Sequence, residues 1–195
     1  QREVLRNQLG LNDPFMIKYS RFLTNAMHGD WGTSFIFKKP ALDIILGKLV
    51  ATLELVFAAT FWIILISIPA GVYCAIKPRG IGSKLIMGIS TIGISVPVFL
   101  TAILLMYVFS IELGWLPSYG RGETVNLLGW ESGLFTIDGL KHLLLPSIAL
   151  SSIMLPLFIR LVRAEMLEAL SSEYVKFAWA KGLDKNKVWF RHALK

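Results

Sequence analysis

The stretch LVFAATFWIILISIPAGVYCAI, residues 55–76, runs through 22 residues without a charged side chain. About 20 apolar helical residues are enough to cross the hydrocarbon core of a bilayer. Two further runs follow, LIMGISTIGISVPVFLTAILLMYVFSI (85–111) and LLLPSIALSSIMLPLFI (143–159), the latter flanked by basic residues that can snorkel to the membrane surface. The sequence therefore predicts three transmembrane helices, over about 51–76, 85–111 and 142–162.

The overall composition agrees with a membrane location. Hydrophobic residues make up 54% of the 195 and charged residues 17%, with a mean hydropathy of +0.60, whereas soluble domains have about 25% charged residues. We therefore expect an all-α, multi-spanning transmembrane protein with the lipid bilayer as a partner. The net charge of +7 is interpreted as loop lysines and arginines. Nucleic acid is not expected as a partner, because no basic stripe alternates with exposed aromatics.

The charges of the loops predict the orientation. The link 77–84 carries three basic residues and no acid, whereas the loop 112–140 carries four acids and a single basic residue, Arg121. Because cytoplasmic loops are enriched in Lys and Arg, we expect 77–84 and the segment 163–195 in the cytoplasm and 112–140 outside. Alternation then makes 1–50 extracytoplasmic, although this long segment is itself basic.

Residues 1–50 are predicted to include an amphipathic helix on the outer membrane surface. Asn12 or Asp13 could cap it and Gly29 could end it, and three aromatics recur at helical spacing, Phe15, Tyr19 and Phe22. Glu54, at the entrance of the first span, suggests an interfacial or capping role rather than catalysis.

Each predicted span contains proline: Pro69, Pro97, and the pair Pro146 and Pro156. A proline frees a backbone carbonyl, which in lipid must find another partner. Two readings stay open, a tolerated kink against a neighbouring helix, or a hinge or broken helix that lines a pathway.

Patterns that carry catalytic chemistry are missing from the sequence. There is no GxxxxGK[ST] phosphate loop, no HExxH or CxxC spacing, and the three histidines are scattered. A set of Ser147, His142 and Asp138 could be imagined, but nothing in the sequence holds it together. The single Cys74 excludes an intrachain disulfide framework. We expect no catalytic residues, no metal site, and, since the three runs lack charges, an energy source outside the membrane.

The segment after the third span is charged and predicted to be helical, unlike the apolar spans before it. RAEMLEALSSEYVKFAWAKG is predicted to extend the span as helix, bend at Ser171–Ser172, and end at Gly182, with Asp184 capping a second helix. Four side chains share one face by their spacing, Tyr174, Phe177, Ala178 and Lys181. The small Ala178 would allow a partner surface to approach. Docking to a partner and resting on lipid headgroups both remain open.

Seven short stretches occur in order along the chain: GDWGTSF (29–35), ATLEL (51–55), SIPAGV (67–72), SVPVFL (95–100), GWLPSYG (114–120), HLLLPSIAL (142–150) and EYVKFAWAKGL…RHAL. They resemble successive landmarks of the permease subunits of binding-protein-dependent ABC importers, in particular the oligopeptide, dipeptide and nickel permease group. The last stretch is similar to the EAA loop of that family when it is aligned on Gly182. Ala178 then matches the second alanine, whereas Lys176 and Phe177 replace the Glu and the first alanine.

Of the later EAA positions, which fall on His192, Leu194 and Lys195, only Leu194 matches. The resemblance implies that a short helix at 173–183 couples the protein to an ATPase, through Glu173, Tyr174, Phe177, Ala178, Lys181, Gly182 and Leu183.

The resemblance also implies the fold, the location and the other subunits of the transporter. We expect a type I ABC importer permease fold in the inner membrane of a prokaryote, a second permease subunit, two cytoplasmic ATPase subunits and an extracytoplasmic solute-binding protein. ATP and Mg would be bound by the ATPases, with no cofactor on this chain. The solute would be a peptide or a related small molecule. Family members have about six spans, so this chain, which opens QREVLRNQLG without Met, is expected to be a fragment holding spans two to four. The alternatives are a secondary transporter or channel subunit not powered by ATP, and a membrane scaffold protein.

Overall fold

A computed structural model describes residues 14–127 and 130–189. The chain is mostly helical, which confirms the predicted all-α class, with one short antiparallel hairpin. It divides into two units, Gln1–Thr52 and Leu53–Lys195.

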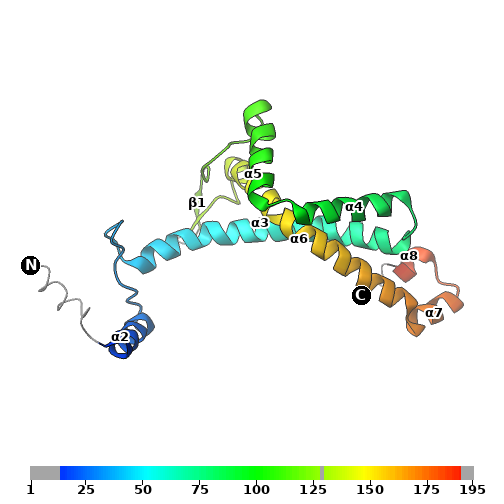
Figure 1. The fold of residues 1–195 in the computed structure, drawn as a ribbon, viewed down its shortest axis with the longest axis horizontal. Helices are drawn as coiled ribbons and strands as arrows, with labels where there is room; N and C mark the ends of the chain where they lie inside the picture. The colour runs from blue at the N-terminus through cyan, green and yellow to red at the C-terminus, as the bar shows by residue number, and fades with distance from the viewer. Residues whose placement is uncertain (1–13, 128–129, 190–195) are drawn as a thin grey trace, which may run out of the picture. The chain divides into compact units, whose positions relative to one another are not determined.

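The first unit contains helix α2, Phe15–Met27 (Figure 1). Pro14 occupies the N-cap position, while Asn12 and Asp13 lie outside the described residues. The helix ends as predicted at Gly29, which has a φ of 85°. The Gly29 N–H donates to the carbonyl of Ala26 (3.1 Å) and the Asp30 N–H to that of Asn25 (2.9 Å). This is the Schellman pattern that satisfies the last carbonyls of a helix.

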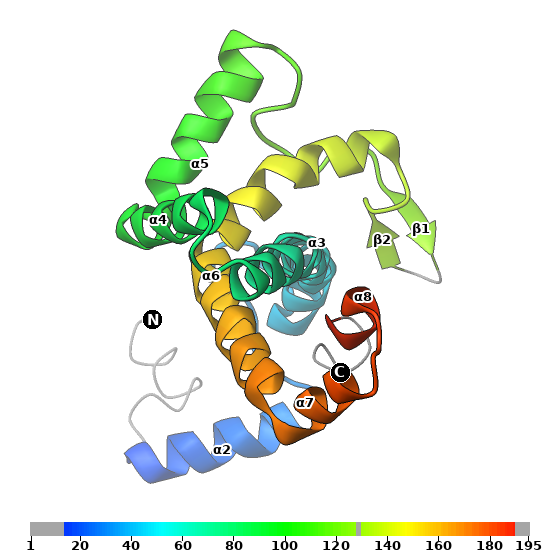
Figure 2. The same cartoon turned by 90° about the vertical axis from the view of Figure 1, so that its right-hand side faces the viewer.

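The second unit is built from α3 (Ala41–Ile76, whose first turns belong to the first unit), α4 (Ile81–Ser95), α5 (Val98–Met106), the π-helix η1 (Tyr107–Glu112), the strands β1 (Val125–Leu127) and β2 (Trp130–Ser132), α6 (Ile137–Ser171), α7 (Glu173–Ala180) and α8 (Lys185–Lys187). Helices α4 and α5 both pack on α6. In Figure 2, α6 also runs beside the C-terminal end of α3, and the two strands lie in the segment before α6.

Among the described residues, α3 and α6 are each long and apolar enough to cross a membrane. Helix α3 begins at Ala41 rather than near residue 51, because residues 41–50 continue the helix although they contain charges. The predicted span 85–111 is bent: α4 and the α5–η1 helix meet at an angle of 104°. The break falls on Val96, which is extended (φ −88°, ψ 122°). A residue that precedes proline, here Pro97, is disfavoured in helical geometry.

The interior of the second unit is small and lies where α3 meets α6. Val72, Ala75 and Met166 are buried together, and Ile76, Val162, Leu170 and Trp189 pack around them. The helices approach closely at Gly71, where a Cβ would lie 2.6 Å from Val162 Cβ. Much of the apolar surface of α3 is exposed, as expected of a helix that faces lipid or further helices.

Buried hydroxyl groups are satisfied by the backbone of the helices. The Ser147 and Ser151 hydroxyls donate to the carbonyls three residues earlier, Leu144 (2.9 Å) and Ile148 (2.8 Å). Cys74 is completely buried. Its carbonyl accepts from the Ser83 hydroxyl (3.4 Å), which joins the end of α3 to the start of α4.

Candidate functional site

The segment that the sequence singled out, residues 172–189, forms a compact unit at the end of α6. Ser172 has an extended backbone (φ −65°, ψ 149°), so α6 stops at Ser171, which confirms the predicted bend. The Ser172 hydroxyl oxygen accepts from the Val175 N–H (3.4 Å) and thereby caps the start of α7.

Gly182 ends α7 in the way its position predicted. It has a φ of 71°, its N–H donates to the Trp179 carbonyl (2.9 Å), and the Leu183 N–H donates to the Ala178 carbonyl (3.4 Å). This second Schellman pattern satisfies two carbonyls of the last turn. The left-handed φ is one that glycine adopts without strain.

One face of α7 is packed inside the chain. Val175, Ala178 and Val188 form a buried cluster, and Leu170 and Leu183 pack against it. Leu170, at the end of α6, also packs against the buried cluster between α3 and α6. The two clusters therefore share a residue, so α7 is attached to the helices rather than hanging from them.

The opposite face of α7 is exposed. Tyr174 and Phe177 are each 60% exposed, and the Lys181 Nζ lies 4.5 Å from the centre of the Phe177 ring. Glu173 forms an exposed ion pair with Lys176 (2.8 Å). The structure thus exposes Tyr174 and Phe177 and brings Lys181 to the Phe177 ring, with Glu173 in the first turn.

Ala178 requires a correction. The sequence placed it on the partner-facing side, but it is only 4% exposed, because its methyl group packs with Val175 and Val188. A partner surface cannot reach it without opening this cluster. His192, Leu194 and Lys195 lie outside the described residues.

The four prolines are placed differently from one another. Pro69 lies inside the continuous α3, and Pro146 and Pro156 lie inside α6. Pro97 stands at the break before α5, and it is the one of the four at which a helix ends. This geometry favours the broken-helix reading for Pro97 and the tolerated-kink reading for the others.

Sequence reasoning missed a second site, around Glu54. Glu54 lies well inside α3, so it does not cap the helix, and it is 5% exposed. Its carboxylate accepts from the Gly133 N–H (2.9 Å) and from Arg121 Nη2 (3.2 Å). Arg121 Nη2 also donates to the Glu131 carbonyl. One buried carboxylate on α3 thus holds both ends of the segment that contains the hairpin. A signal existed in the sequence: Arg121 is the only basic residue of the acidic loop.

The same loop is tied to the first turn of α6. The Thr136 hydroxyl caps α6 by accepting from the Gly139 N–H (2.9 Å) and donates to the Glu123 carbonyl (2.6 Å). The Glu123 N–H donates to the Asp138 carboxylate (2.9 Å). A side chain at Gly139 would place Cβ 2.2 Å from the Gly133 oxygen. The loop therefore depends on a close approach that glycine permits.

The imagined catalytic set is not assembled. His142 Nδ1 lies 3.5 Å from the Asp138 carboxylate, but the Ser147 hydroxyl donates to the Leu144 carbonyl instead. Within residues 14–127 and 130–189, no group of three or more His, Cys, Asp or Glu side chains could hold a metal ion.

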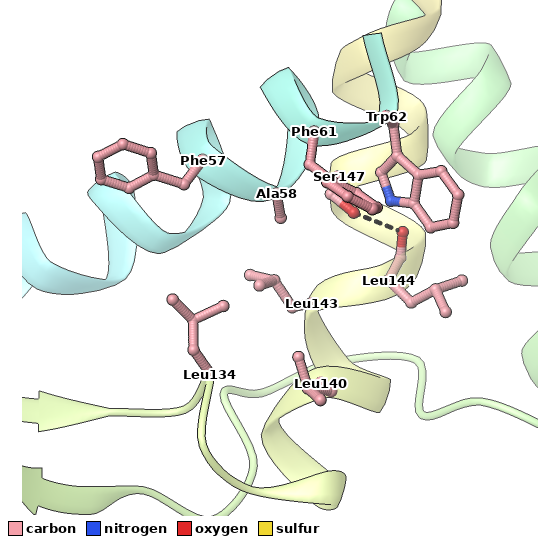
Figure 3. A pocket seen from close by; sticks show the side chains of 9 residues that line it. All are labelled: Phe57, Ala58, Phe61, Trp62, Leu134, Leu140, Leu143, Leu144 and Ser147. Carbon is pink, nitrogen blue, oxygen red and sulfur yellow. Dashed lines mark hydrogen bonds between the residues drawn. The ribbon is translucent and has the colours of Figure 1, made fainter. Parts of the chain in front are cut away.

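A cavity of about 410 Å³ lies between α3 and α6, beside the loop (Figure 3). Its walls are almost wholly apolar, and they comprise Phe57, Ala58, Phe61, Trp62, Leu134, Leu140, Leu143, Leu144 and Ser147. None of the described residues that line it is charged, so its chemistry suits an apolar group rather than a polar solute.

Comparisons with known proteins bear on what these features do. A family model described as "Binding-protein-dependent transport system inner membrane component" matches residues 67–195. The chain is 36% identical, over 98% of its length, to the dipeptide transport system permease protein DppB of Alkalihalophilus pseudofirmus, of which the match covers 61%. It is 37% identical over its whole length to the oligopeptide transport system permease protein AppB of Bacillus subtilis, covering 60% of it. The glutathione transport system permease protein GsiC of Escherichia coli is 32% identical over 99% of this chain, which covers 58% of GsiC. The chain thus spans about three fifths of the length of these relatives.

Proposed function

This chain belongs to the family of binding-protein-dependent transport system inner-membrane components, and we propose on that premise that it forms part of a permease subunit of an ATP-driven importer. Its role is to build one side of the pathway through a prokaryotic cell membrane and to couple that pathway to ATP hydrolysis by other subunits. The phosphate loop that binds ATP is absent from its sequence.

The partners follow from this role. A second permease subunit completes the pathway, two cytoplasmic ATPase subunits bind ATP and Mg, and an extracytoplasmic solute-binding protein delivers the solute. The relatives are named for transport of a dipeptide, an oligopeptide and glutathione. All three solutes are peptides, and we infer that the solute of this protein is a peptide or a related small molecule.

The observation that carries the proposal is the construction of α7. An eight-residue helix, capped at both ends, is anchored by Val175 and Ala178 and presents Tyr174 and Phe177 outward. An exposed aromatic pair on a rigidly held helix fits a groove on another protein. A helix that only rested on headgroups would not need this internal anchoring.

The packing suggests how motion is transmitted. Movement of an ATPase groove around Phe177 would displace α7 as a unit, because Val175 and Ala178 join it to Val188. Leu170 passes the displacement to the cluster between α6 and α3. ATP binding would then favour one arrangement of the helices through different contacts at this joint.

Cysteine cross-linking in the full-length subunit, with Cys74 replaced by Ser, tests the proposal. The subunit is assembled with its ATPases in membranes, and a thiol cross-linker is applied with and without ATP. Phe177→Cys should cross-link to an ATPase subunit with a yield that ATP changes. Ala178→Cys is the matched control, one residue away but buried, and should give little product.

Two results would count against the proposal. Equal yields at both positions would mean that the exposed face is not the docking face. Absence of any product from Phe177→Cys and Tyr174→Cys, in complexes that purify intact, would leave α7 resting on lipid.

A further inference from the structure

A second cavity, of about 310 Å³, opens at the C-terminal end of α3. Its walls are the last turns of α3 and one residue that follows α8: Ile68, Pro69, Val72, Tyr73, Ile76, Lys77 and Trp189. Nearly all of this surface is hydrocarbon or aromatic ring. Among the described residues, the one charged group in the lining is the ammonium of Lys77.

Lys77 stands at the start of a basic stretch of the chain. Lys77 Nζ lies 5.7 Å from the centre of the Tyr73 ring, and Arg79 and Lys84 follow in the connection to α4 and its first turn. All three cations are exposed, and within the part of the chain that the structure describes no carboxylate pairs with any of them. The charge is therefore available to a ligand.

The helix ends leave this basic character intact. Because of the helix dipole, the C-terminus of α3 carries a partial charge of about −0.5. The N-terminus of α4, which begins at Ile81, carries a partial charge of about +0.5. These partial charges oppose each other, so the full positive charge of Lys77, which lines the cavity, is the larger effect there.

This cavity has apolar walls and a cation at one end, and it lies at the terminus of a membrane-spanning helix. A ligand that suits it has an apolar chain and an anionic head group. We propose that this cavity binds an anionic phospholipid of the membrane, with an acyl chain along Pro69 and Val72 and the phosphate at Lys77. A free phosphate would gain nothing from the apolar walls. An uncharged apolar helix would leave the cations without a partner.

The position of Trp189 gives the lipid a role. Trp189 lines the cavity and also packs against the cluster of Val72, Ala75 and Met166. It directly follows Val188, which anchors α7. A lipid in the cavity would hold Trp189 against α3, and so stiffen the joint through which α7 acts.

The test uses the full-length subunit in its assembled complex, reconstituted in nanodiscs with equal amounts of palmitoyl-oleoyl phosphatidylglycerol and phosphatidylcholine. Native mass spectrometry after release counts the lipids retained. The unsubstituted complex should retain phosphatidylglycerol in preference to phosphatidylcholine. Lys77→Gln should lower that retention about fivefold. Lys141→Gln, which removes the same charge at the opposite end of α6, should leave it unchanged.

A second variant separates the cavity from general surface charge. Ile68→Trp fills the slot and keeps every cation, so it should also lower retention, and Ile68→Phe replaces it if that complex does not assemble. No preference for phosphatidylglycerol, equal effects of Lys77→Gln and Lys141→Gln, or full retention when the slot is filled would each overturn the proposal. Because the readout is lipid retention, these results are independent of whether α7 docks to an ATPase.

Discussion

Replacing Glu54 by Gln should release the acidic loop from α3. The substitution preserves shape, and its amide oxygen can still accept from the Gly133 N–H. Its amide nitrogen, however, is a donor and cannot accept from Arg121, which now donates to Glu54 at 3.2 Å. Hydrogen bonds to charged groups contribute about 1.5–3 kcal/mol. The Arg121 side chain is 30% exposed, so water recovers part of that loss, and we expect the local opening free energy to fall by about 2 kcal/mol.

Hydrogen–deuterium exchange of the full-length protein in nanodiscs measures this opening. The Gly133 amide is the reporter, because its proton is held by the Glu54 carboxylate (2.9 Å). A fall of about 2 kcal/mol corresponds to roughly thirtyfold faster exchange in peptides that contain residue 133. Glu123→Gln is the control, since it removes an exposed carboxylate from the same loop.

A double-mutant cycle with Arg121→Gln isolates the pair. If Glu54 and Arg121 act together, the double variant should exchange little faster than either single variant. Additive effects, or exchange by Glu54→Gln within threefold of the unsubstituted protein, would refute the reasoning. The loop would then be held chiefly by Thr136 and Asp138 at the start of α6.

Two further substitutions test close backbone geometry. Gly182→Ala places a side chain at a φ of 71°, so it should destabilise the end of α7 by about 1–2 kcal/mol. Trypsin should then cleave faster after Lys181 and Lys185. Unchanged cleavage would contradict the Schellman cap. Gly71→Ala puts a Cβ 2.6 Å from Val162 Cβ, which should cost about 1–3 kcal/mol and lower the thermal unfolding temperature of the reconstituted complex. Gly88→Ala, where a Cβ has nothing within 4 Å, is its control, and equal unfolding temperatures for the two variants would argue against the contact.

The apolar helices and the ends of the short helix α7 could be predicted from the sequence. The apolar runs predicted membrane-spanning helices because hydropathy over about 20 residues is a property of the segment alone. Ser172 and Gly182 marked the start and end of α7 correctly, since caps depend on neighbouring backbone groups. Pro97 signalled a discontinuity, although the angle of 104° between α4 and the α5–η1 helix did not follow from it.

Contacts between distant segments decided the rest. Spacing placed Ala178 with Tyr174 and Phe177, but only the position of Val188 turned its methyl group inward. Glu54 and Arg121 are 67 residues apart, and their pairing depends on how the loop folds back on α3. By itself, the sequence determined which segments are helical and apolar, because hydrogen bonds within a helix and hydropathy are local. Which side of each helix is buried, and which charges meet, was decided by the tertiary structure, because packing brings together groups that the chain order keeps apart.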